Sequence, residues 1–381
     1  MPPMDFVVAP QAELRPGIIE LRWGTPGLSL LPVEEVGAAA REMLRLVGPP
    51  ALDYGTNEGP EVLRAALDEI AITDGISPAL HQLAGLLVRP GDVVLVEDPG
   101  YSLALGLLRD LGIEPVGVPF DAHGLDVERL PGVLAGVREQ GLRPRLLYTV
   151  PTFHNPTGVS LGDDRRRRLV ELAVEEDLLI VEDDVYRELW YDRPSPPSLW
   201  SLAREVDGGA DHVVRLGSFS KSLAPGLRCG FLTGSPALVR RYADSGLIDS
   251  AGCLSQFTSL IVAVLLHDGA YDGIVERFRQ AYRERRDALV AWLRAALPDG
   301  CSFTAPEGGY FVWVSLPPPL TASRLRPAAE AAGVSFVGGA PFSVARADHS
   351  LRLCFAMYGP EDLTEGAVRL GRAIARALRV L

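Results

Sequence analysis

A single lysine stands out in this chain, which otherwise uses arginine for its basic residues. The 381 residues include 37 lysines and arginines, and only Lys221 is a lysine. It lies in a loop of small residues after a predicted strand, with hydroxyls at Ser218 and Ser220 and a guanidinium at Arg228. Hydroxyls, loop N–H groups and an arginine are donors suited to a phosphate. A primary amine beside them can form a Schiff base with an aldehyde cofactor that carries that phosphate, which an always-charged arginine cannot do. The alternative is a surface lysine retained by chance.

Polar residues also follow two other predicted strands. Asp183 and Asp184 come after a strand expected over residues 178–181. Acids at this position either face a ligand at the carboxyl end of the sheet or form an acidic strand-end turn, which is common in parallel sheets. Asn155 lies in a turn after a strand expected over residues 146–149. Taken alone, each motif is also typical of an ordinary turn. Only their combination indicates a functional site.

Two candidate anion sites complete the set. Gly75, Ile76 and Ser77 precede a helix expected to begin at Pro78, so their amides would point at an anion at the helix N-terminus. Arg352 is a lone charge on a largely apolar predicted strand, and an unpaired buried charge is costly, so we expect an anionic partner. The cysteines and histidines lack metal-site or disulfide spacing, and no metal is expected.

The elements that must position these residues alternate along the first part of the chain. Strands are expected over residues 93–96, 115–118, 146–149, 178–181 and 213–216, and helices over residues 78–87, 102–111 and 164–176. This alternation predicts an α/β fold with a mostly parallel sheet covered by helices, which binds ligands at the carboxyl ends of its strands. Beyond about residue 255, a smaller α+β domain is predicted from helices over residues 271–297 and 360–378 and strands over residues 311–314 and 351–355.

The composition argues against several kinds of partner. The net charge of −12 disfavours binding to nucleic acid or to an anionic membrane. The basic run at residues 165–168 has an amphipathic continuation and indicates a solvated helix face. No apolar stretch reaches the ~18 residues of a membrane helix, and the N-terminus does not resemble a signal peptide, so we expect a cytoplasmic protein.

In series, these motifs resemble the fold-type I pyridoxal-phosphate enzymes, and within them the class I and II aminotransferases of the aminoadipate and kynurenine branch. The resemblance extends from about Gly24 to the last helix. It implies a large cofactor-binding domain at residues 45–265 with a mostly parallel seven-stranded sheet. Residues 1–44 and 266–381 would form the small domain, including an N-terminal segment that covers the substrate. The implied cofactor is pyridoxal 5′-phosphate, and the implied substrates are an amino acid and a 2-oxo acid.

The resemblance also implies a role for each motif. Lys221 would form the internal aldimine and move the α-proton, Asp183 would face the pyridine nitrogen, and Tyr186 would face the cofactor phenolate. The phosphate and ring would be held by Gly75, Ile76, Ser77, Tyr101, Ser218, Ser220 and Arg228. The substrate would be held by Gly24, Asn155 and Arg352, and Asn155 would also touch the phenolate oxygen. Arg22 and Trp23 are candidates for side-chain recognition, whereas His154 is expected only to form part of the pocket wall.

Tyr54 resembles the tyrosine that reaches the cofactor phosphate of the other subunit, which implies a homodimer with a shared active site. One departure from the family pattern lies between Arg64 and Thr73, where a helix and a loop are replaced by a short link. This departure argues against an ordinary amino-acid substrate and is compatible with a bulky one.

Two alternatives stay open at the level of sequence. The same residues could serve a C–S β-lyase or a decarboxylating or deaminating enzyme that acts on a bulky amino-acid conjugate. A non-catalytic regulator that reuses this fold is the other alternative, but the sequence before Gly24 leaves no room for a DNA-binding domain.

Overall fold

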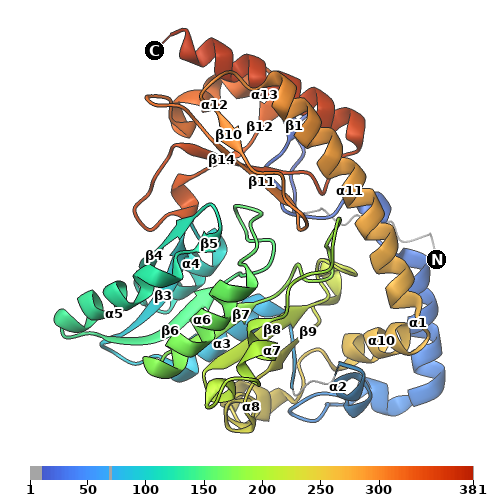
Figure 1. Cartoon of the computed structure of the whole chain (residues 1–381). Coiled ribbons are helices and arrows are strands. Elements are labelled where there is room, and N and C mark those ends of the chain that lie inside the picture. The colour runs from blue at the N-terminus through green and yellow to red at the C-terminus, as the bar shows by residue number, and fades with distance from the viewer. Residues whose placement is uncertain (1–10, 68–70, 381) are drawn as a thin grey trace.

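The computed structural model describes residues 11–67 and 71–380, and a large mixed sheet forms its centre (Figure 1). The strand order is β2-β9-β8-β7-β6-β3-β4-β5. The five strands from β8 to β4 are parallel, whereas β9 and β5 are antiparallel to their neighbours. The strands are β2 (Ala71–Thr73), β3 (Asp92–Asp98), β4 (Val116–Asp121), β5 (Gly124–Leu125), β6 (Arg143–Thr149), β7 (Leu179–Asp183), β8 (Val213–Ser218) and β9 (Gly230–Thr233). The expected seven strands are therefore extended by β5, a two-residue strand that folds back on β4.

Helices cover both faces of this sheet, because neighbouring strand residues point to opposite sides. Val94 and Val96 of β3 pack with α3, α4 and α8, while Leu95 packs with α5, α6 and α7. The covering helices are α3 (Ile76–Leu87), α4 (Ser102–Asp110), α8 (Pro236–Ala243), α5 (Leu130–Glu139), α6 (Asp163–Glu175) and α7 (Leu199–Ala203). The predicted α/β architecture is confirmed, with strand and helix boundaries displaced by a few residues.

The basic run at the start of α6 is not wholly solvated, so that interpretation is wrong for Arg166. This side chain is fully buried. Its guanidinium donates to the carbonyls of Leu161, Pro151 and Pro197 at 2.6–3.0 Å and to Oγ1 of Thr152 at 2.9 Å. Burial lowers the pKa of Arg166. Through these hydrogen bonds it joins α6 to the loop after β6.

The second, smaller unit lies above the carboxyl ends of the large sheet in Figure 1. Its sheet has the order β10-β11-β14-β13, and a separate parallel pair joins β1 to β12. The elements are β1 (Ile19–Glu20), β10 (Ser302–Phe303), β11 (Phe311–Ser315), β12 (Val334–Ser335), β13 (Val337–Gly338), β14 (Ser350–Cys354), α12 (Ala322–Ala331) and α13 (Pro360–Leu378). The β1–β12 pairing ties the N-terminal segment to this unit.

A long helix, α11 (Ala270–Ala296), runs beside both units and packs against α13 (Figure 1). Below it, α10 (Gln256–His267) packs against α1 (Val33–Val47) and α2 (Glu61–Leu67), whereas α9 (Gly246–Ala251) packs against α8. Short 3-10 helices occupy Leu28–Leu30, Pro49–Leu52, Val127–Arg129, Gly209–Asp211, Pro225–Leu227 and Ala340–Phe342. The predicted domain limits fall inside α1 and α10, and the division stays a prediction.

Across the described residues, no single helix has the length and apolar character to cross a membrane. Taken together, α10 and α11 meet those criteria, but they are bent by 86° relative to each other.

Candidate active site

A cavity of about 710 Å³ opens between the two units, at the carboxyl ends of the parallel strands. Strand ends, loops and the small sheet each contribute to its wall. The residues that line it include Arg22, Trp23, Gly24, Ile76, Ser77, Tyr101, Asn155, Asp183, Tyr186, Ser218, Ser220, Lys221, Arg228 and Arg352. The fold therefore brings nearly all of the predicted site residues together from distant parts of the sequence.

The three consecutive acids at the end of β7 have separate partners. Glu182 accepts hydrogen bonds from the N–H groups of Leu199 and Trp200 at the start of α7, at 2.8 and 3.0 Å. Asp184 pairs with Arg187 and, at 2.9 Å, with Arg215. Neither carboxylate lines the cavity.

Asp183 alone of these acids faces the cavity. Its Oδ2 accepts a hydrogen bond from the Tyr148 hydroxyl at 2.6 Å, and its Oδ1 accepts one from the N–H of Val185 at 3.3 Å. Burial raises the pKa of Asp183 to about 7, against the opposing effect of the Tyr148 hydrogen bond. A carboxylate in this setting gains from a cationic partner such as a protonated ring nitrogen. The structure thus distinguishes Asp183 from Asp184 by its surroundings.

Lys221 lies in the loop after β8 with its amine directed into the cavity. Its Nζ donates to the carbonyl of Gly24 at 2.7 Å and lies 5.4 Å from the ring centre of Tyr310. Desolvation lowers the pKa of Lys221 to about 8. Roughly a tenth of the amine is then uncharged at pH 7, compared with less than a thousandth for an ordinary lysine. Such an amine is suited to nucleophilic addition and to proton transfer.

A cluster of donors sits beside Lys221. The Ser218 and Ser220 hydroxyls are 2.9 Å apart, and Nη1 of Arg228 lies 3.3 Å from Oγ of Ser220. The helix α3 begins at Ile76, two residues before the expected start at Pro78, so Gly75 is its N-cap and Ile76 and Ser77 form its first turn. Gly75 has φ +93°, and a Cβ there would lie 2.9 Å from Nη2 of Arg228.

Such a cluster fits a phosphate in both charge and geometry. The hydroxyls, the guanidinium and the helix N-terminus all favour an anion. The bare glycine leaves room for the guanidinium against the backbone. The site residues therefore fit an aldehyde cofactor that carries a phosphate, and Lys221 and Asp183 line the same cavity.

Arg352 provides a second anion site from β14, where it lies opposite Trp313 and Val337. Its Nη1 donates to Oδ1 of Asn155 at 3.1 Å and its Nη2 to the carbonyl of Arg22 at 2.8 Å. Among the described residues, its buried Nε has no hydrogen-bond partner. Burial lowers the pKa of Arg352. A buried guanidinium without a carboxylate partner matches the predicted need for an anionic ligand.

Aromatic rings from both units complete the wall. The guanidinium of Arg352 lies over the rings of Phe311 and Phe342, at 4.3 and 4.9 Å. Tyr186 is almost fully buried and packs edge-on against Phe311, and burial raises its pKa. Burial also raises the pKa of Tyr101 to about 12. Both phenols therefore stay protonated at neutral pH and serve as hydrogen-bond donors.

The family-model comparison decides which family this arrangement represents. The model of aminotransferase class I and II matches residues 30–370. The chain belongs to the class I and II aminotransferases.

Individual relatives agree with this assignment. The aminotransferase is 37% identical to a 2-aminoadipate transaminase of Thermus thermophilus, over 96% of this chain and 92% of that protein. It is 34% identical to aromatic-amino-acid aminotransferase 1 of Thermococcus litoralis, over 95% and 89% of the two chains. A solved structure is that of the α-aminoadipate aminotransferase of Thermus thermophilus, complexed with N-(5′-phosphopyridoxyl)-L-leucine. It superposes on this chain with a TM-score of 0.87 at 36% sequence identity, and the match covers 96% of this chain and 94% of that one.

These findings confirm the predicted family, fold and cofactor: the protein is a pyridoxal-phosphate-dependent aminotransferase of fold type I. They give no support to the lyase alternative.

Some predicted residues of the aminotransferase lie elsewhere than the main cavity. Tyr54 is 82% exposed and lines a separate hollow with Leu52, Cys253 and Phe257. His154 is not part of the pocket wall, so that expectation is wrong; it is buried behind Asn155. Its ring contacts the carboxylate of Glu97 at 3.1 Å and stacks on Phe120.

Sequence reasoning missed Tyr148, whose hydroxyl contacts Asp183. A signal was present, because Tyr148 is the one side chain with a polar tip among the apolar residues 146–148 of β6. Phe342 was also missed, since it lies in a loop with no motif around it.

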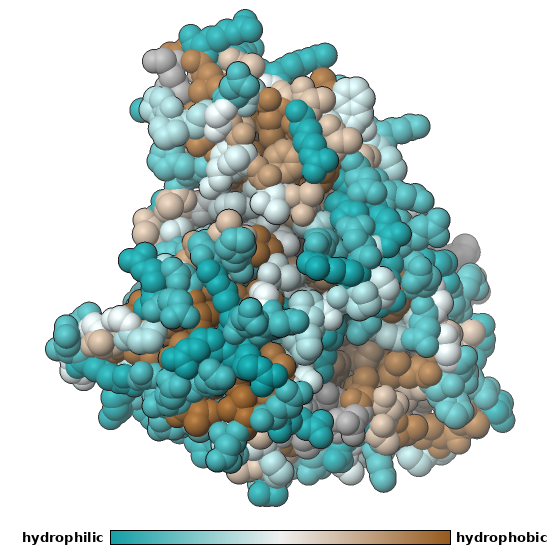
Figure 2. All heavy atoms as spheres, in the orientation of Figure 1, coloured by the Kyte–Doolittle hydropathy of each residue, from teal (hydrophilic) through white to brown (hydrophobic). Residues whose placement is uncertain are grey.

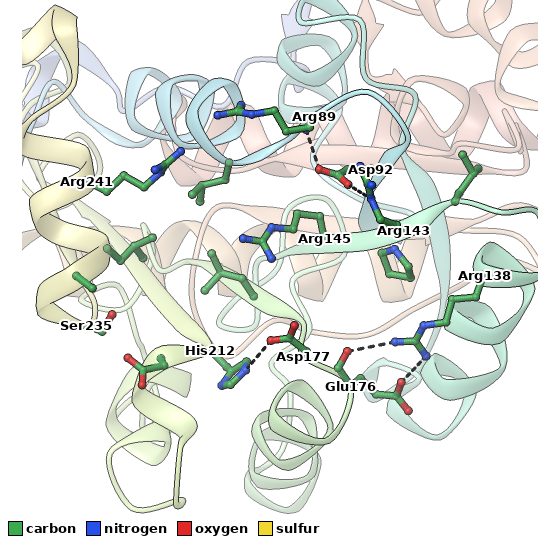
Figure 3. A pocket seen from close by; sticks show the side chains of 17 residues that line it. Arg89, Asp92, Arg138, Arg143, Arg145, Glu176, Asp177, His212, Ser235 and Arg241 are labelled. Atoms are coloured by element: carbon green, nitrogen blue, oxygen red, sulfur yellow. Dashed lines mark hydrogen bonds and ion pairs between the residues drawn. The ribbon is translucent and has the colours of Figure 1, made fainter.

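A second and larger cavity, of about 1010 Å³, lies at the opposite, amino ends of the parallel strands (Figure 3). Its charged residues largely pair with one another: Arg143 contacts Asp92 at 2.7 Å, and Arg138 contacts Glu176 at 2.5 Å. No amine capable of Schiff-base chemistry lines it, because the only lysine is in the other cavity. The chemistry of the aminotransferase therefore resides in the smaller cavity.

Proposed function

We propose that the cavity around Lys221 carries out transamination of a 2-amino acid with a long or aromatic side chain, with each residue in a defined role. The observation that carries the proposal is the presence in one cavity of an amine with lowered pKa, a buried carboxylate and a guanidinium without a carboxylate partner. The phosphate would be held by Gly75, Ile76, Ser77, Ser218, Ser220 and Arg228, and the ring by Tyr101, Asn155, Asp183 and Tyr186.

When bound, the cofactor supplies an electron sink for the electron pair left at the substrate α-carbon. Nζ of Lys221 accepts the proton released from that carbon. Asp183 would face the ring nitrogen of the cofactor, and the hydroxyl of Tyr148 keeps the carboxylate in place. Arg352 and Asn155 orient the substrate through its α-carboxylate, and Gly24 lets the N-terminal segment close over the substrate without a side chain in the way.

The side-chain preference is supported by the cavity mouth and by the relatives. Arg22 lies over the ring of Trp23 at 4.8 Å, and Leu103, Val337 and Phe342 add apolar wall. The named relatives act on 2-aminoadipate and on aromatic amino acids. A cationic and aromatic mouth suits both kinds of side chain.

We also propose that the enzyme is a cytoplasmic homodimer whose active sites are shared. Supporting this, exposed apolar side chains gather around the hollow near α2 and α10, where Figure 2 shows an apolar area. Leu52, Tyr54, Leu254 and Phe257 are 38–82% exposed in the single chain. Burial against a second copy would remove this surface from water and would carry Tyr54 toward the partner's cavity.

The first test uses the visible absorption of the purified protein. We expect a band that borohydride abolishes and that the variant Lys221→Ala lacks. Long-chain, aromatic and small amino acids added singly should convert the band to that of the aminated cofactor, with the long and aromatic ones reacting fastest. Release of ammonia and a 2-oxo acid without this conversion would instead establish a lyase.

The second test mixes two inactive variants, Lys221→Ala and Tyr54→Ala. If the sites are shared, heterodimers contain one intact site, and random pairing restores about a quarter of the wild-type activity. No recovery on mixing, together with an active monomer in gel filtration, would overturn the shared site.

A further inference from the structure

The turn that carries Asn155 is anchored from behind by a buried pair, Glu97 and His154. Both side chains are at most 2% exposed, and neither lines the active-site cavity. Glu97 lies in β3 and His154 in the loop that follows the neighbouring strand β6. Nε2 of His154 lies 3.1 Å from Oε2 of Glu97.

Glu97 fastens both ends of the segment from residue 149 to residue 154. Its Oε1 accepts a hydrogen bond from the Thr149 hydroxyl at 2.6 Å, and its Oε2 accepts one from the N–H of Val150 at 2.9 Å. The same Oε2 contacts His154, four residues further along. A single carboxylate thus links the end of β6 to the residue before Asn155.

Two neighbouring side chains contact the ring nitrogens of His154. Nδ1 lies 2.8 Å from Oγ1 of Thr157, which also accepts a hydrogen bond from the N–H of Val159 at 3.3 Å. Nε2 lies 3.1 Å from Oε2 of Glu97, a close contact without the geometry of a hydrogen bond. The ring is therefore held between Thr157 and the carboxylate of Glu97.

This turn needs an anchor because its backbone is not relaxed. Phe153, directly before His154, has φ +49°, a left-handed conformation that a bulky L residue rarely adopts. The imidazole of His154 also stacks on Phe120, with 4.6 Å between ring centres. Contacts on both sides of the ring therefore hold the residue next to Asn155.

We infer that Glu97 and His154 are positioning residues for the substrate carboxylate: they fix Asn155, and Asn155 through its Oδ1 fixes the guanidinium of Arg352. The inference rests on the proposed function of Arg352, whose Nη1 is 3.1 Å from Oδ1 of Asn155. Neither Glu97 nor His154 touches the substrate or the cofactor in this arrangement.

The test compares two replacements of the histidine. His154→Phe keeps a flat ring for stacking on Phe120 but removes both nitrogens. His154→Gln keeps an N–H that reaches toward Glu97. We expect His154→Phe to raise the dissociation constant of an unreactive 2-methyl amino acid, and the KM for amino acid and 2-oxo acid, about tenfold, which corresponds to about 1.4 kcal/mol. His154→Gln should recover most of this loss, and Glu97→Gln should resemble His154→Phe.

Cofactor affinity and thermal stability separate positioning from general damage. The cofactor dissociation constant should change less than threefold in the folded His154→Phe enzyme, because Asn155 is only one of the proposed ring contacts and the phosphate and lysine sites lie on other loops. His349→Phe is the matched control, since the ring of that histidine contacts the carbonyl of Leu320 and the residue lies outside the cavity. It should leave ligand binding unchanged.

The variant Arg352→Ala distinguishes the two levels of the proposal. If Arg352→Ala binds the 2-methyl amino acid as tightly as wild type, the proposed role of Arg352 is wrong. Two results would overturn the positioning role and leave the proposed function standing. In the first, Arg352→Ala weakens binding of the 2-methyl amino acid while His154→Phe and Glu97→Gln leave it unchanged. In the second, His154→Gln binds this ligand as weakly as His154→Phe. Should His154→Phe fail to fold, the same comparison between Glu97→Gln and wild type decides.

Discussion

Replacing Asp183 with asparagine should stabilise the cofactor-free protein while abolishing transamination. Asp183 has the ordinary carboxyl pKa of 3.8 in the unfolded chain and a pKa of about 7 in the folded protein. Between these values the folded state holds a proton that the unfolded state has lost, so stability falls as the pH rises from about 4 to about 7. A shift of about three units corresponds to about 4 kcal/mol, fully lost above pH 7.

Asparagine carries no charge, but its buried amide costs about 1–2 kcal/mol. We therefore expect Asp183→Asn to raise the free energy of unfolding at pH 8 by about 2–3 kcal/mol. At pH 5, where the wild-type carboxyl is already protonated, the gain should disappear. The assay is urea unfolding of the cofactor-free proteins at both pH values and at one protein concentration.

The neighbouring acid provides the matched control, because its surroundings have the opposite effect. Burial alone would raise the pKa of Asp184, but Arg187 and Arg215 outweigh it and lower that pKa. Asp184→Asn should therefore destabilise the protein at pH 8 by about 3 kcal/mol, since it removes one partner of a buried ion pair. Equal effects of the two substitutions, or a gain for Asp183→Asn that does not depend on pH, would refute the reasoning.

Three further predictions concern single contacts. Tyr148→Phe removes the hydroxyl that favours ionised Asp183, so the pKa of Asp183 should rise by about one unit. The upper end of the pH range over which the free energy of unfolding of the cofactor-free protein falls should rise by the same amount. An unchanged pH profile of stability would contradict this. Gly75→Ala places a Cβ 2.9 Å from Arg228 at a residue with φ +93°. It should weaken cofactor binding at least about tenfold in a fluorescence titration. Gly85→Ala, whose Cβ has nothing within 4 Å, should leave cofactor binding unchanged. Arg166→Met removes the guanidinium that donates to three carbonyls and to the hydroxyl of Thr152, and it should lower the free energy of unfolding by about 3 kcal/mol. Arg167→Met, at a half-exposed ion pair, should change it by less than about 0.5 kcal/mol. Similar losses for both would show that burial of Arg166 is unimportant.

The fold and most of the site followed from the sequence because both depend on local patterns. Apolar runs such as residues 93–96 predicted buried strands, and polar residues directly after them had to meet at one edge of a parallel sheet. Lys221 and Asp183 could be placed in this way. The order of the strands in space and the pairing of β1 with β12 depend on contacts between distant residues, so no local pattern contained them.

Residues that act through burial were harder to predict. Arg166 lies in a run of four arginines, and nothing in that run distinguishes the one that turns inward toward the loop after β6. His154 faces Glu97, which is 57 positions away in the sequence. Tyr54 acts, on our proposal, across a subunit boundary, and a single chain contains no information on what lies opposite it.

Two cations of the active site, Lys221 and Arg352, share one further property: each already holds a backbone carbonyl of the same short stretch of chain. Lys221 binds the carbonyl of Gly24, and Arg352 binds that of Arg22. An arriving ligand must exchange with these carbonyls, so its affinity reflects only the difference between the new contacts and those it displaces. The stretch from Arg22 to Gly24 is therefore an intramolecular competitor, and occupancy of the cavity and the position of the N-terminal segment are thermodynamically coupled.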